Sequence, residues 1–234
     1  MRNRMMTGRV VMVQTGTPRA FGPKGQPSAI AKTPVAGRVA VTPRGLAGDV
    51  QGDPAHHGGP DKALHAYPRS HYAAWCADLP NRAAALTDGR FGENLVLDGI
   101  SEADLCLGDI FALGQARVQV SQARQPCWKL NIRFDTPDMA RRVQASGRTG
   151  WYFRVLVPGA VAAGDALTPE ARPNPGWPLP RAHALLYRDP LDRATLAEFA
   201  ALAGLSASWR DLAQRRAASG TVESWQSRLE GGER

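Results

Sequence analysis

Short segments rich in β-branched and aromatic residues recur along the first two thirds of the chain, and they constrain its fold most strongly. Gly, Pro or Asp bounds each of them, as is usual for β-strands. Because the segments follow one another at short intervals with turn signals between them, they favour a barrel or sandwich over alternating β/α units. The predicted strands are residues 8–14, 37–42, 95–97, 110–113, 117–121 and 151–157.

Two helices are predicted to interrupt this series. The first covers about residues 69–79, where apolar side chains recur at helical spacing along one face that includes Cys76. Cys76 is therefore expected in the core. The second begins with Thr136 as its N-cap and Pro137 at its first helical position, and it ends at Gly147.

A proline-rich segment divides the chain. Residues 172–180 contain four prolines and one glycine, which neither helices nor strands tolerate in their interior. Beyond it, Leu196 and Phe199 share an apolar helix face, and Ser206 is placed to cap a further helix. We therefore predict a β domain at residues 8–170, a linker at 171–180 and a small three-helix unit at 181–234.

Composition indicates a cytoplasmic protein. The net charge of +8 predicts a broadly basic surface that suits an anionic ligand or an acidic partner, while nucleic-acid binding lacks a recognition motif. Three irregularly placed cysteines argue against a disulfide framework and for a reducing compartment. No apolar run approaches the roughly 20 residues of a membrane span, so we expect neither secretion nor membrane insertion.

Several common enzyme plans are excluded by the sequence. No two glycines are separated by a single residue, so the dinucleotide-binding turn is absent, and no Gly-Lys pair forms a P-loop. A nucleophile elbow of the G-x-S-x-G type is also absent. Three scattered cysteines cannot hold a four-cysteine iron–sulfur cluster. Redox chemistry here would need a cofactor that is bound by other means.

Two polar clusters with glycines are candidates for a site. The first runs from His56 to Lys62 and includes His57, Gly58 and Gly59, where backbone without a Cβ can approach a ligand closely. An ordinary turn is the alternative for this cluster. The second is Phe91-Gly92-Glu93-Asn94, which precedes a predicted strand, and a loop cap is its alternative.

The third cluster is the most informative and extends from Ser121 to Lys129. Its thiol, Cys127, follows Pro126 and lies between the guanidinium of Arg124 and the ammonium of Lys129. Neighbouring cations favour the ionised thiolate, which is the form that binds metals and acts as a nucleophile. A small buried thiol is the alternative, and it describes Cys76 and Cys106 better, because Cys106 lies between two leucines in a strand-like segment.

Taken together, these motifs resemble the MOSC domain, named after the C-terminal part of molybdenum-cofactor sulfurase, over about residues 8–167. The helical tail looks like the three-helix extension of the YiiM branch, the hydroxylaminopurine-resistance proteins. Six pieces occur in the family's order: Gly45-Leu46-Ala47-Gly48-Asp49, His57-Gly58-Gly59, Phe91-Gly92-Glu93-Asn94-Leu95, Gly108-Asp109, Arg124-Gln125-Pro126-Cys127 and Gly150-Trp151.

The resemblance implies a mostly antiparallel β-barrel, of the pyruvate-kinase-barrel type, and a molybdopterin cofactor whose molybdenum is held by Cys127. It also implies reduction of N-hydroxylated purines and related N–OH compounds, which consumes two electrons and two protons and releases water. His57 and Glu93 are expected to deliver protons or to orient the cofactor. The residues expected around the cofactor are His57, Gly58, Gly59, Lys62, Phe91, Gly92, Glu93, Asn94, Ser121, Arg124, Pro126 and Lys129.

Other functions and partners stay open on the sequence alone. The chain could carry or store the molybdenum cofactor, or a labile sulfur on Cys127, without turnover, or act as a basic interaction module without a cofactor. Since the sequence shows no motif for a second redox group, we expect a separate electron-donating reductase. A homodimer is a further expectation, and the tail is expected to support docking or dimerisation rather than catalysis.

Overall fold

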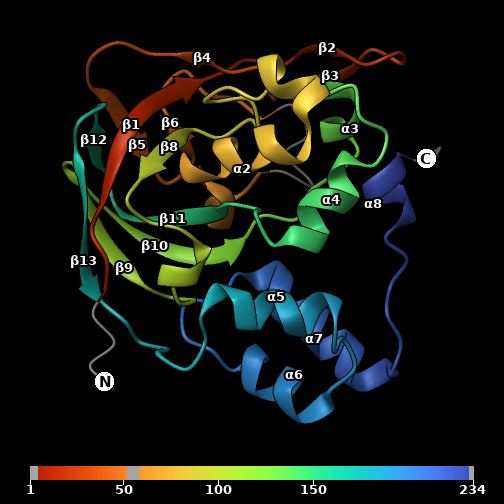
Figure 1. Ribbon diagram of the computed structural model, residues 1–234. Coiled ribbons are helices and arrows are strands. Elements are labelled where there is room, and N and C mark those ends of the chain that lie inside the picture. Colours follow the sequence, from red (N-terminus) through yellow and green to blue (C-terminus); the bar gives the residue numbers. More distant parts are fainter. Residues whose placement is uncertain (1–4, 52–57, 232–234) are drawn as a thin grey trace.

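A β-barrel forms the centre of the computed structural model, which describes residues 5–51 and 58–231 (Figure 1). In this described part, seven strands pair in a ring that closes where the last strand meets the first, so the predicted barrel is confirmed. The barrel strands are β1 (Gly8–Thr15), β7 (Leu64–Pro68), β8 (Leu95–Asp98), β9 (Ile110–Leu113), β10 (Ala116–Ala123), β11 (Trp151–Val157) and β13 (Ala166–Ala171).

Neighbouring strands of the ring run antiparallel at every pairing of the described residues except β7 with β8, which is parallel. The predicted segments 110–113 and 151–157 coincide with β9 and β11. Segment 37–42 forms β5 (Val39–Thr42), which lies outside the ring in a small sheet. The remaining short strands are β2 (Arg19–Phe21), β3 (Gln26–Ser28), β4 (Thr33–Pro34), β6 (Gly45–Leu46) and β12 (Gly159–Val161).

Strand β7 was not predicted from the sequence. All five of its residues are buried, because helices and strands cover both of its faces, so the alternation of a half-exposed strand is missing. It contains His65, and it ends in Pro68, a residue that is uncommon inside strands. This strand matters for function because it brings His65 to the candidate site.

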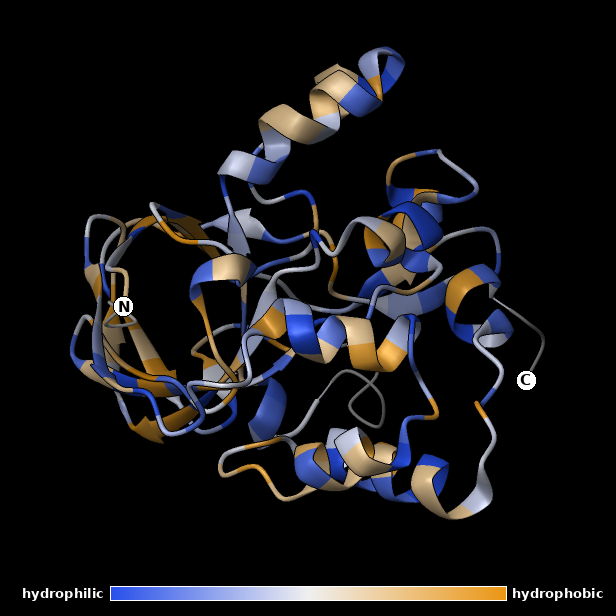
Figure 2. Ribbon diagram, turned by 60° about the horizontal axis from the view of Figure 1, so that its bottom comes forward, coloured by the Kyte–Doolittle hydropathy of each residue, from blue (hydrophilic) through white to orange (hydrophobic). Residues whose placement is uncertain are grey.

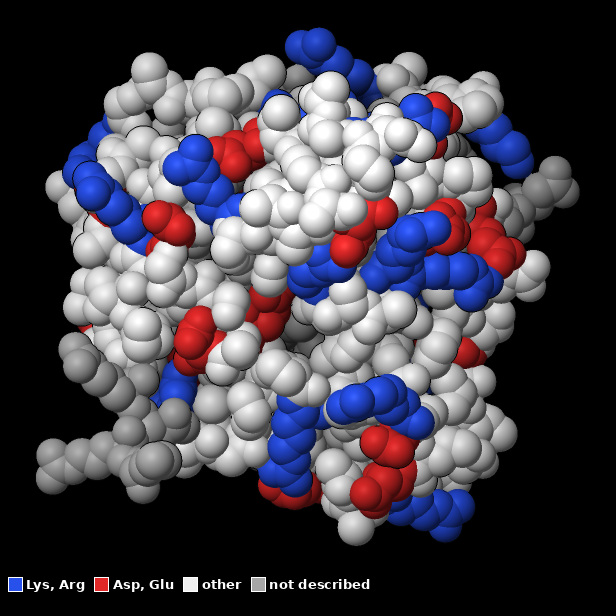
Figure 3. Space-filling view, viewed as in Figure 1, with Lys and Arg blue, Asp and Glu red and all other residues white. Residues whose placement is uncertain are grey.

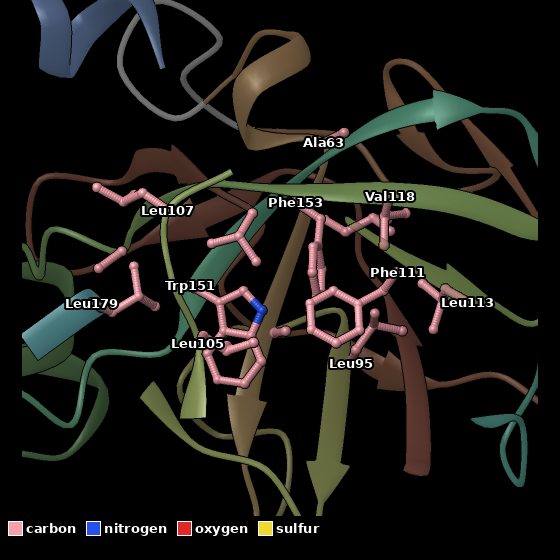
Figure 4. Close-up of a cluster of buried hydrophobic side chains, with 14 of the residues drawn as sticks. Ala63, Leu95, Leu105, Leu107, Phe111, Leu113, Val118, Trp151, Phe153 and Leu179 are labelled. Carbon is pink, nitrogen blue, oxygen red and sulfur yellow. The ribbon is translucent and has the colours of Figure 1, made fainter. Parts of the chain in front are cut away.

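The barrel interior is a packed core of aliphatic and aromatic side chains (Figure 4). Trp151 and Phe153 of β11 meet edge to face, with ring centroids 6.0 Å apart, and Phe153 meets Phe111 of β9 at 6.3 Å. The same cluster continues through Leu179 into the C-terminal helices. The barrel and the helical tail therefore share one core.

A second apolar cluster fills the space between three helices beside the barrel. Tyr72 and Trp75 of α2 (Ser70–Asp78) are buried in it, while Cys76 is only partly buried at its edge. The other two helices are α3 (Lys129–Arg133) and α4 (Met139–Ser146). The described residues also form three short 3-10 segments, namely η1 (Pro60–Lys62), η2 (Pro80–Ala85) and η3 (Glu102–Asp104), of which η2 packs on α2.

Two local predictions are wrong. Helix α4 has Asp138 as its N-cap, because the Thr136 hydroxyl donates to the Phe134 carbonyl instead of capping the helix. Its end at Gly147 is as predicted, since that residue adopts the left-handed backbone that terminates helices. Cys106 is buried but forms only an isolated bridge with Pro178, so it does not belong to a strand.

The proline-rich segment packs against the barrel. The Trp177 carbonyl accepts a hydrogen bond from the Leu107 amide, and the Trp177 ring lies tilted against that of Phe199 with centroids 5.1 Å apart. Helix α5 (Leu179–Tyr187) begins inside the stretch predicted as a linker. Helix α7 (Ala207–Ser219) starts after Ser206, whose hydroxyl accepts from the Trp209 amide as expected. The other C-terminal helices are α6 (Arg193–Ala200) and α8 (Gln226–Glu230).

Figure 2 shows hydrophobic residues concentrated on the barrel strands, whereas the helices mix both kinds of residue. Basic side chains are spread over several elements on the face in Figure 3, and acidic ones lie beside many of them. Among the described residues, no helix is both long and apolar enough to cross a membrane.

Candidate functional site

A cavity opens at one end of the barrel, where the segments after β3, β6 and β10 meet β7, β11 and the loop before β8. The empty space within it, including its open mouth, is about 610 Å³. Its lining brings together seven of the residues predicted for the site from three separate clusters. These are Lys62, Phe91, Gly92, Asn94, Arg124, Cys127 and Lys129.

The cavity is strongly cationic. Its described lining contains Lys32, Lys62, Arg124 and Lys129 but only one carboxylate, that of Asp49. Arg124 is 6% exposed, and its Nη1 has no hydrogen-bond partner among the described residues. A buried guanidinium nitrogen without an acceptor is costly, so a ligand that offers an anionic oxygen would be stabilised here.

Lys32 and Asp49 form a buried ion pair at the cavity wall. The second carboxylate oxygen of Asp49 accepts from Asn94 Nδ2 at 2.9 Å. Asn94 also donates to the Gln14 carbonyl and accepts from the His65 amide, so both of its amide donors are engaged within the protein. Asn94 therefore joins β1, β7 and the segment after β6 around the cavity.

His65 is a cavity residue that the sequence reasoning missed. Its ring is buried beside Tyr152, with centroids 5.1 Å apart, and Nε2 has no hydrogen-bond partner among the described residues. Burial and the nearby Arg124 charge hold the pKa of His65 well below its ordinary value, so the imidazole is neutral near pH 7. His65 thus brings a neutral imidazole, rather than a charge, to the cavity wall.

Cys127 follows β10 and immediately precedes α3. Cys127 is 7% exposed and lines the cavity. The Leu130 amide donates to the Cys127 carbonyl, which starts the turn into α3. Lys129, two residues on, is fixed by a 3.2 Å bond from Nζ to the Pro27 carbonyl. Of the three cysteines, all of them free, Cys127 is the one that lines the cavity.

Gly92 and Phe91 also line the cavity. Gly92 has φ +79°, and a Cβ there would approach Ile30 Cγ1 to 2.8 Å, so the position favours glycine. Phe91 is fully buried and stacks on Tyr67 with ring centroids 4.4 Å apart. Both residues shape the wall, and Phe91 joins it to the second apolar cluster.

Glu93 does not line the cavity, contrary to its expected role there. Its Oε1 accepts from the Tyr72 hydroxyl and, at 3.1 Å, from the Gly89 amide on the side of the second apolar cluster. Burial raises the pKa of Glu93. In the loop before β8, Phe91, Gly92 and Asn94 line the cavity, whereas the Glu93 carboxylate is directed to Tyr72 and Gly89.

Four other predicted site residues are not part of the described lining. Ser121 is fully buried and donates to the carbonyls of Asp61 and Tyr152. Gly58 and Gly59 precede η1, and Pro126 adjoins Cys127 without lining the cavity. His57 lies outside the described residues.

The cavity residues that sequence reasoning missed include Lys32, Asp49, His65 and Tyr152. Asp49 could have been found, because it ends the Gly45-Leu46-Ala47-Gly48-Asp49 motif. His65 and Tyr152 lie in strands whose neighbours are apolar, and Lys32 carries no motif at all. Only the fold brings these residues to Cys127.

The described residues fit the molybdenum cofactor that the resemblance implies. A pterin phosphate would find the unpartnered Arg124 nitrogen and further cations, and the metal would find one thiol at Cys127. Within residues 5–51 and 58–231, no three His, Cys, Asp or Glu side chains are grouped to hold a metal ion.

Comparisons with known proteins agree with this architecture. The MOSC domain family matches residues 53–168, and the YiiM-like, 3-alpha helix domain family matches residues 177–220. Protein YiiM of Escherichia coli is 42% identical over 221 residues, which cover 94% of this chain and 98% of that protein. The crystal structure of YiiM from Escherichia coli aligns with a TM-score of 0.79 at 36% identity, covering 93% of this chain and 99% of that one.

A longer relative also matches. A protein named "Reductase" from Gibberella moniliformis is 39% identical over 151 residues, which cover 64% of this chain. The matched part is 27% of that protein.

Proposed function

The chain belongs to the MOSC domain family, with a YiiM-like three-helix domain after the barrel, and from this premise we propose that it reduces N-hydroxylated compounds at a molybdenum cofactor bound through Cys127. The observation that carries the proposal is one cavity-lining thiol among four cations, one of which has an unpartnered buried nitrogen. The relative named a reductase supports an oxidoreductase role.

The residues of the cavity have separable roles in this proposal. Cys127 supplies an anionic sulfur ligand to the metal. Arg124, with Lys62 and Lys129, binds the cofactor phosphate and keeps it at the cationic wall. When bound, the molybdenum cofactor supplies the two-electron chemistry that converts N–OH to N–H and water.

His65 takes the hydrogen-bonding role that we expected of Glu93, and the role expected of His57, which lies outside the described residues, stays a proposal beside it. Its neutral ring lines the cavity, whereas the Glu93 carboxyl points away from it. His65 can therefore orient an N–OH group or relay one of the two protons that the reduction consumes. The phenol of Tyr152 lies beside it, and burial raises the pKa of that phenol, so Tyr152 stays a neutral hydrogen-bond donor.

The first prediction tests cofactor binding. We expect protein made in a host that synthesises molybdopterin to contain molybdenum and to release a fluorescent pterin on oxidation. Elemental analysis and fluorescence of the denatured supernatant measure the two components. Intact protein that contains neither component after gentle purification would contradict cofactor binding and, with it, the proposed enzyme activity.

The same preparation separates the enzyme from a carrier. We expect the loaded protein to convert an N-hydroxylated purine to the amine when an artificial electron donor is present. Loaded protein that turns over no N–OH compound under these conditions would favour a molybdenum-cofactor or sulfur carrier instead. Release of intact cofactor to an acceptor protein would then be the activity to measure.

The second prediction concerns the electron source. The sequence has no dinucleotide-binding turn and too few cysteines for an iron–sulfur cluster, so we propose that a separate reductase delivers the electrons. Loaded protein with substrate and NADH alone should show no steady turnover above the protein-free blank. Turnover should begin when a dithionite-reduced dye or a suitable reductase is added. Sustained NADH oxidation by the purified chain would contradict this prediction.

A further inference from the structure

The end of the chain returns to the loop that carries Cys127. Helix α8 lies beside α4 in Figure 1. It begins at Gln226, about 100 residues after Cys127 in the sequence. It also lies beyond residues 177–220, the part matched by the three-helix family. Leu229 of α8 is 1% exposed, so this short helix is packed against the protein.

Arg228 holds the loop on both sides of Cys127. Its Nη1 donates to the Pro126 carbonyl at 2.7 Å, and its own carbonyl accepts from the Trp128 amide at 2.8 Å. The residues immediately before and after Cys127 are thus bonded to one residue of α8. A charge-assisted bond from a guanidinium is among the stronger hydrogen bonds in proteins.

Arg228 is itself fixed from the other direction. Its Nη2 donates to Gln144 Oε1 of α4 at 2.7 Å, so the planar guanidinium bridges α4 and the Cys127 loop. Asn131 of α3 donates to the Leu229 carbonyl at 2.9 Å. Gly231 lies against the Trp128 ring, where an added Cβ would come within 3.1 Å of the ring.

A second C-terminal residue extends this contact. The Tyr187 hydroxyl of α5 accepts from Gln125 Nε2 at 3.3 Å, and its ring meets Trp225 edge to face. Arg216 of α7 pairs with Glu223 and so fixes the segment that leads into α8. Residues 125, 126 and 128 are therefore each held by the C-terminal extension.

We infer that Arg228 is a positioning residue, which holds the backbone of residues 126–128 so that the Cys127 thiol stays at the cavity wall. A cysteine ligand on a loop needs such support, because a site that is loose by about 1 Å loses affinity and rate. The C-terminal extension thereby gains a role in site geometry besides the docking role expected from its apolar faces. The importance of Cys127 in this inference rests on the proposed function.

The test uses full-length, cofactor-free protein from a host that lacks molybdopterin synthesis, so that its outcome does not depend on the proposed reaction. We would compare Arg228→Ala with wild type by hydrogen exchange over residues 126–131. Iodoacetamide labelling at a fixed pH, resolved by peptide mass spectrometry, would report the rate at Cys127. Cys106, which is 2% exposed, is the internal reference for global opening.

Arg228→Ala removes the charge-assisted bonds to Pro126 and Gln144 but keeps the carbonyl that accepts from the Trp128 amide. We therefore expect the labelling rate of Cys127 to rise by about tenfold or more, the effect of losing charge-assisted hydrogen bonds. The exchange rate of the Trp128 amide should also rise, because α8 is then held less firmly against the loop. The matched control is Arg141→Ala, which removes the exposed ion pair between Arg141 of α4 and Glu230 of α8. It leaves the bonds from Arg228 to the Cys127 loop in place. That control should change either rate by less than about twofold, as for exposed ion pairs.

Arg228→Lys keeps the charge but cannot bond to two acceptors in the same planar fork, so it should give an intermediate increase at Cys127. Equal rates in Arg228→Ala and Arg141→Ala would overturn the inference. If Arg228→Ala raises labelling of Cys106 as strongly as that of Cys127, the protein has opened globally and the Lys variant decides. A selective rise at Cys127 in that variant supports positioning, and no rise overturns it.

Discussion

Replacement of Cys127 by Ser is expected to leave the protein folded while removing bound molybdenum and N–OH reduction. The serine hydroxyl has a similar shape but does not ionise near neutral pH, so the metal loses its soft anionic ligand. Loss of an outer-shell partner alone commonly costs about 10–100-fold in metal affinity or activity, so removal of the ligand itself should cost more. The phosphate contacts of Arg124 remain, and some pterin should still be retained.

The other two cysteines provide the controls. Cys106 is buried beside the Pro175 carbonyl and lies away from the cavity, and Cys76 is partly buried at the edge of the second apolar cluster. Serine at either position should lower stability by about 1–3 kcal/mol at most, the cost of a poorly bonded buried hydroxyl, without changing metal content. Molybdenum analysis and initial rates measure the three variants side by side. A Cys127→Ser rate near that of wild type, with loss of activity in Cys106→Ser instead, would show that the metal ligand is misassigned.

Replacement of Arg172 by Met should lower the free energy of unfolding more than serine at Cys76 or Cys106 does. The Asp109 side chain is completely buried, and Arg172 is its cationic partner, with Nη2 2.6 Å from Oδ2 and Nε 2.9 Å from Oδ1. Arg172 also donates to the Asp104 carbonyl at 2.6 Å. Removing one member of a buried pair leaves an uncompensated charge, which costs about 3–5 kcal/mol. The variant should therefore unfold at a clearly lower urea concentration, with the slope of the transition unchanged.

A surface pair provides the matched control for this experiment. Arg38 forms a similar two-nitrogen contact with Asp165, but the Arg38 side chain is 43% exposed. Arg38→Met should therefore cost no more than about 1 kcal/mol. Equal losses in the two variants would mean that burial does not set the strength of the Arg172–Asp109 pair. Asp109→Leu combined with Arg172→Met should recover part of the loss, since no unpaired charge then remains, although the Cys106 amide loses its acceptor.

The Arg172–Asp109 pair also explains one of the sequence motifs. Gly108-Asp109 was part of the resemblance to the MOSC domain but had no assigned role. In the structure, Asp109 accepts from the Cys106 amide and from Arg172, which is the first residue after β13. The motif thus fastens the proline-rich segment to the barrel. Its role is structural and separate from the chemistry of the cavity.

Sequence alone determined the parts of this protein whose signals are local. Strand β11 was predicted with its observed bounds, because it is rich in aromatic and aliphatic residues and lies between Gly150 and the Pro158-Gly159 turn. Ser206 was identified as a cap because its hydroxyl bonds only three residues away. Cys127 stood out among three cysteines because Arg124 and Lys129 flank it within five residues.

The tertiary structure alone decided which distant residues meet at the cavity. His65 reaches it because the fully buried β7 pairs with β11, and Glu93 is kept out of it by its hydrogen bonds with Tyr72 and Gly89. Arg228 meets Pro126 across 102 positions of sequence. Such contacts depend on how the whole chain folds. Folding is driven mainly by burial of apolar surface, which is non-directional, so a short stretch of sequence does not specify which distant residues will meet.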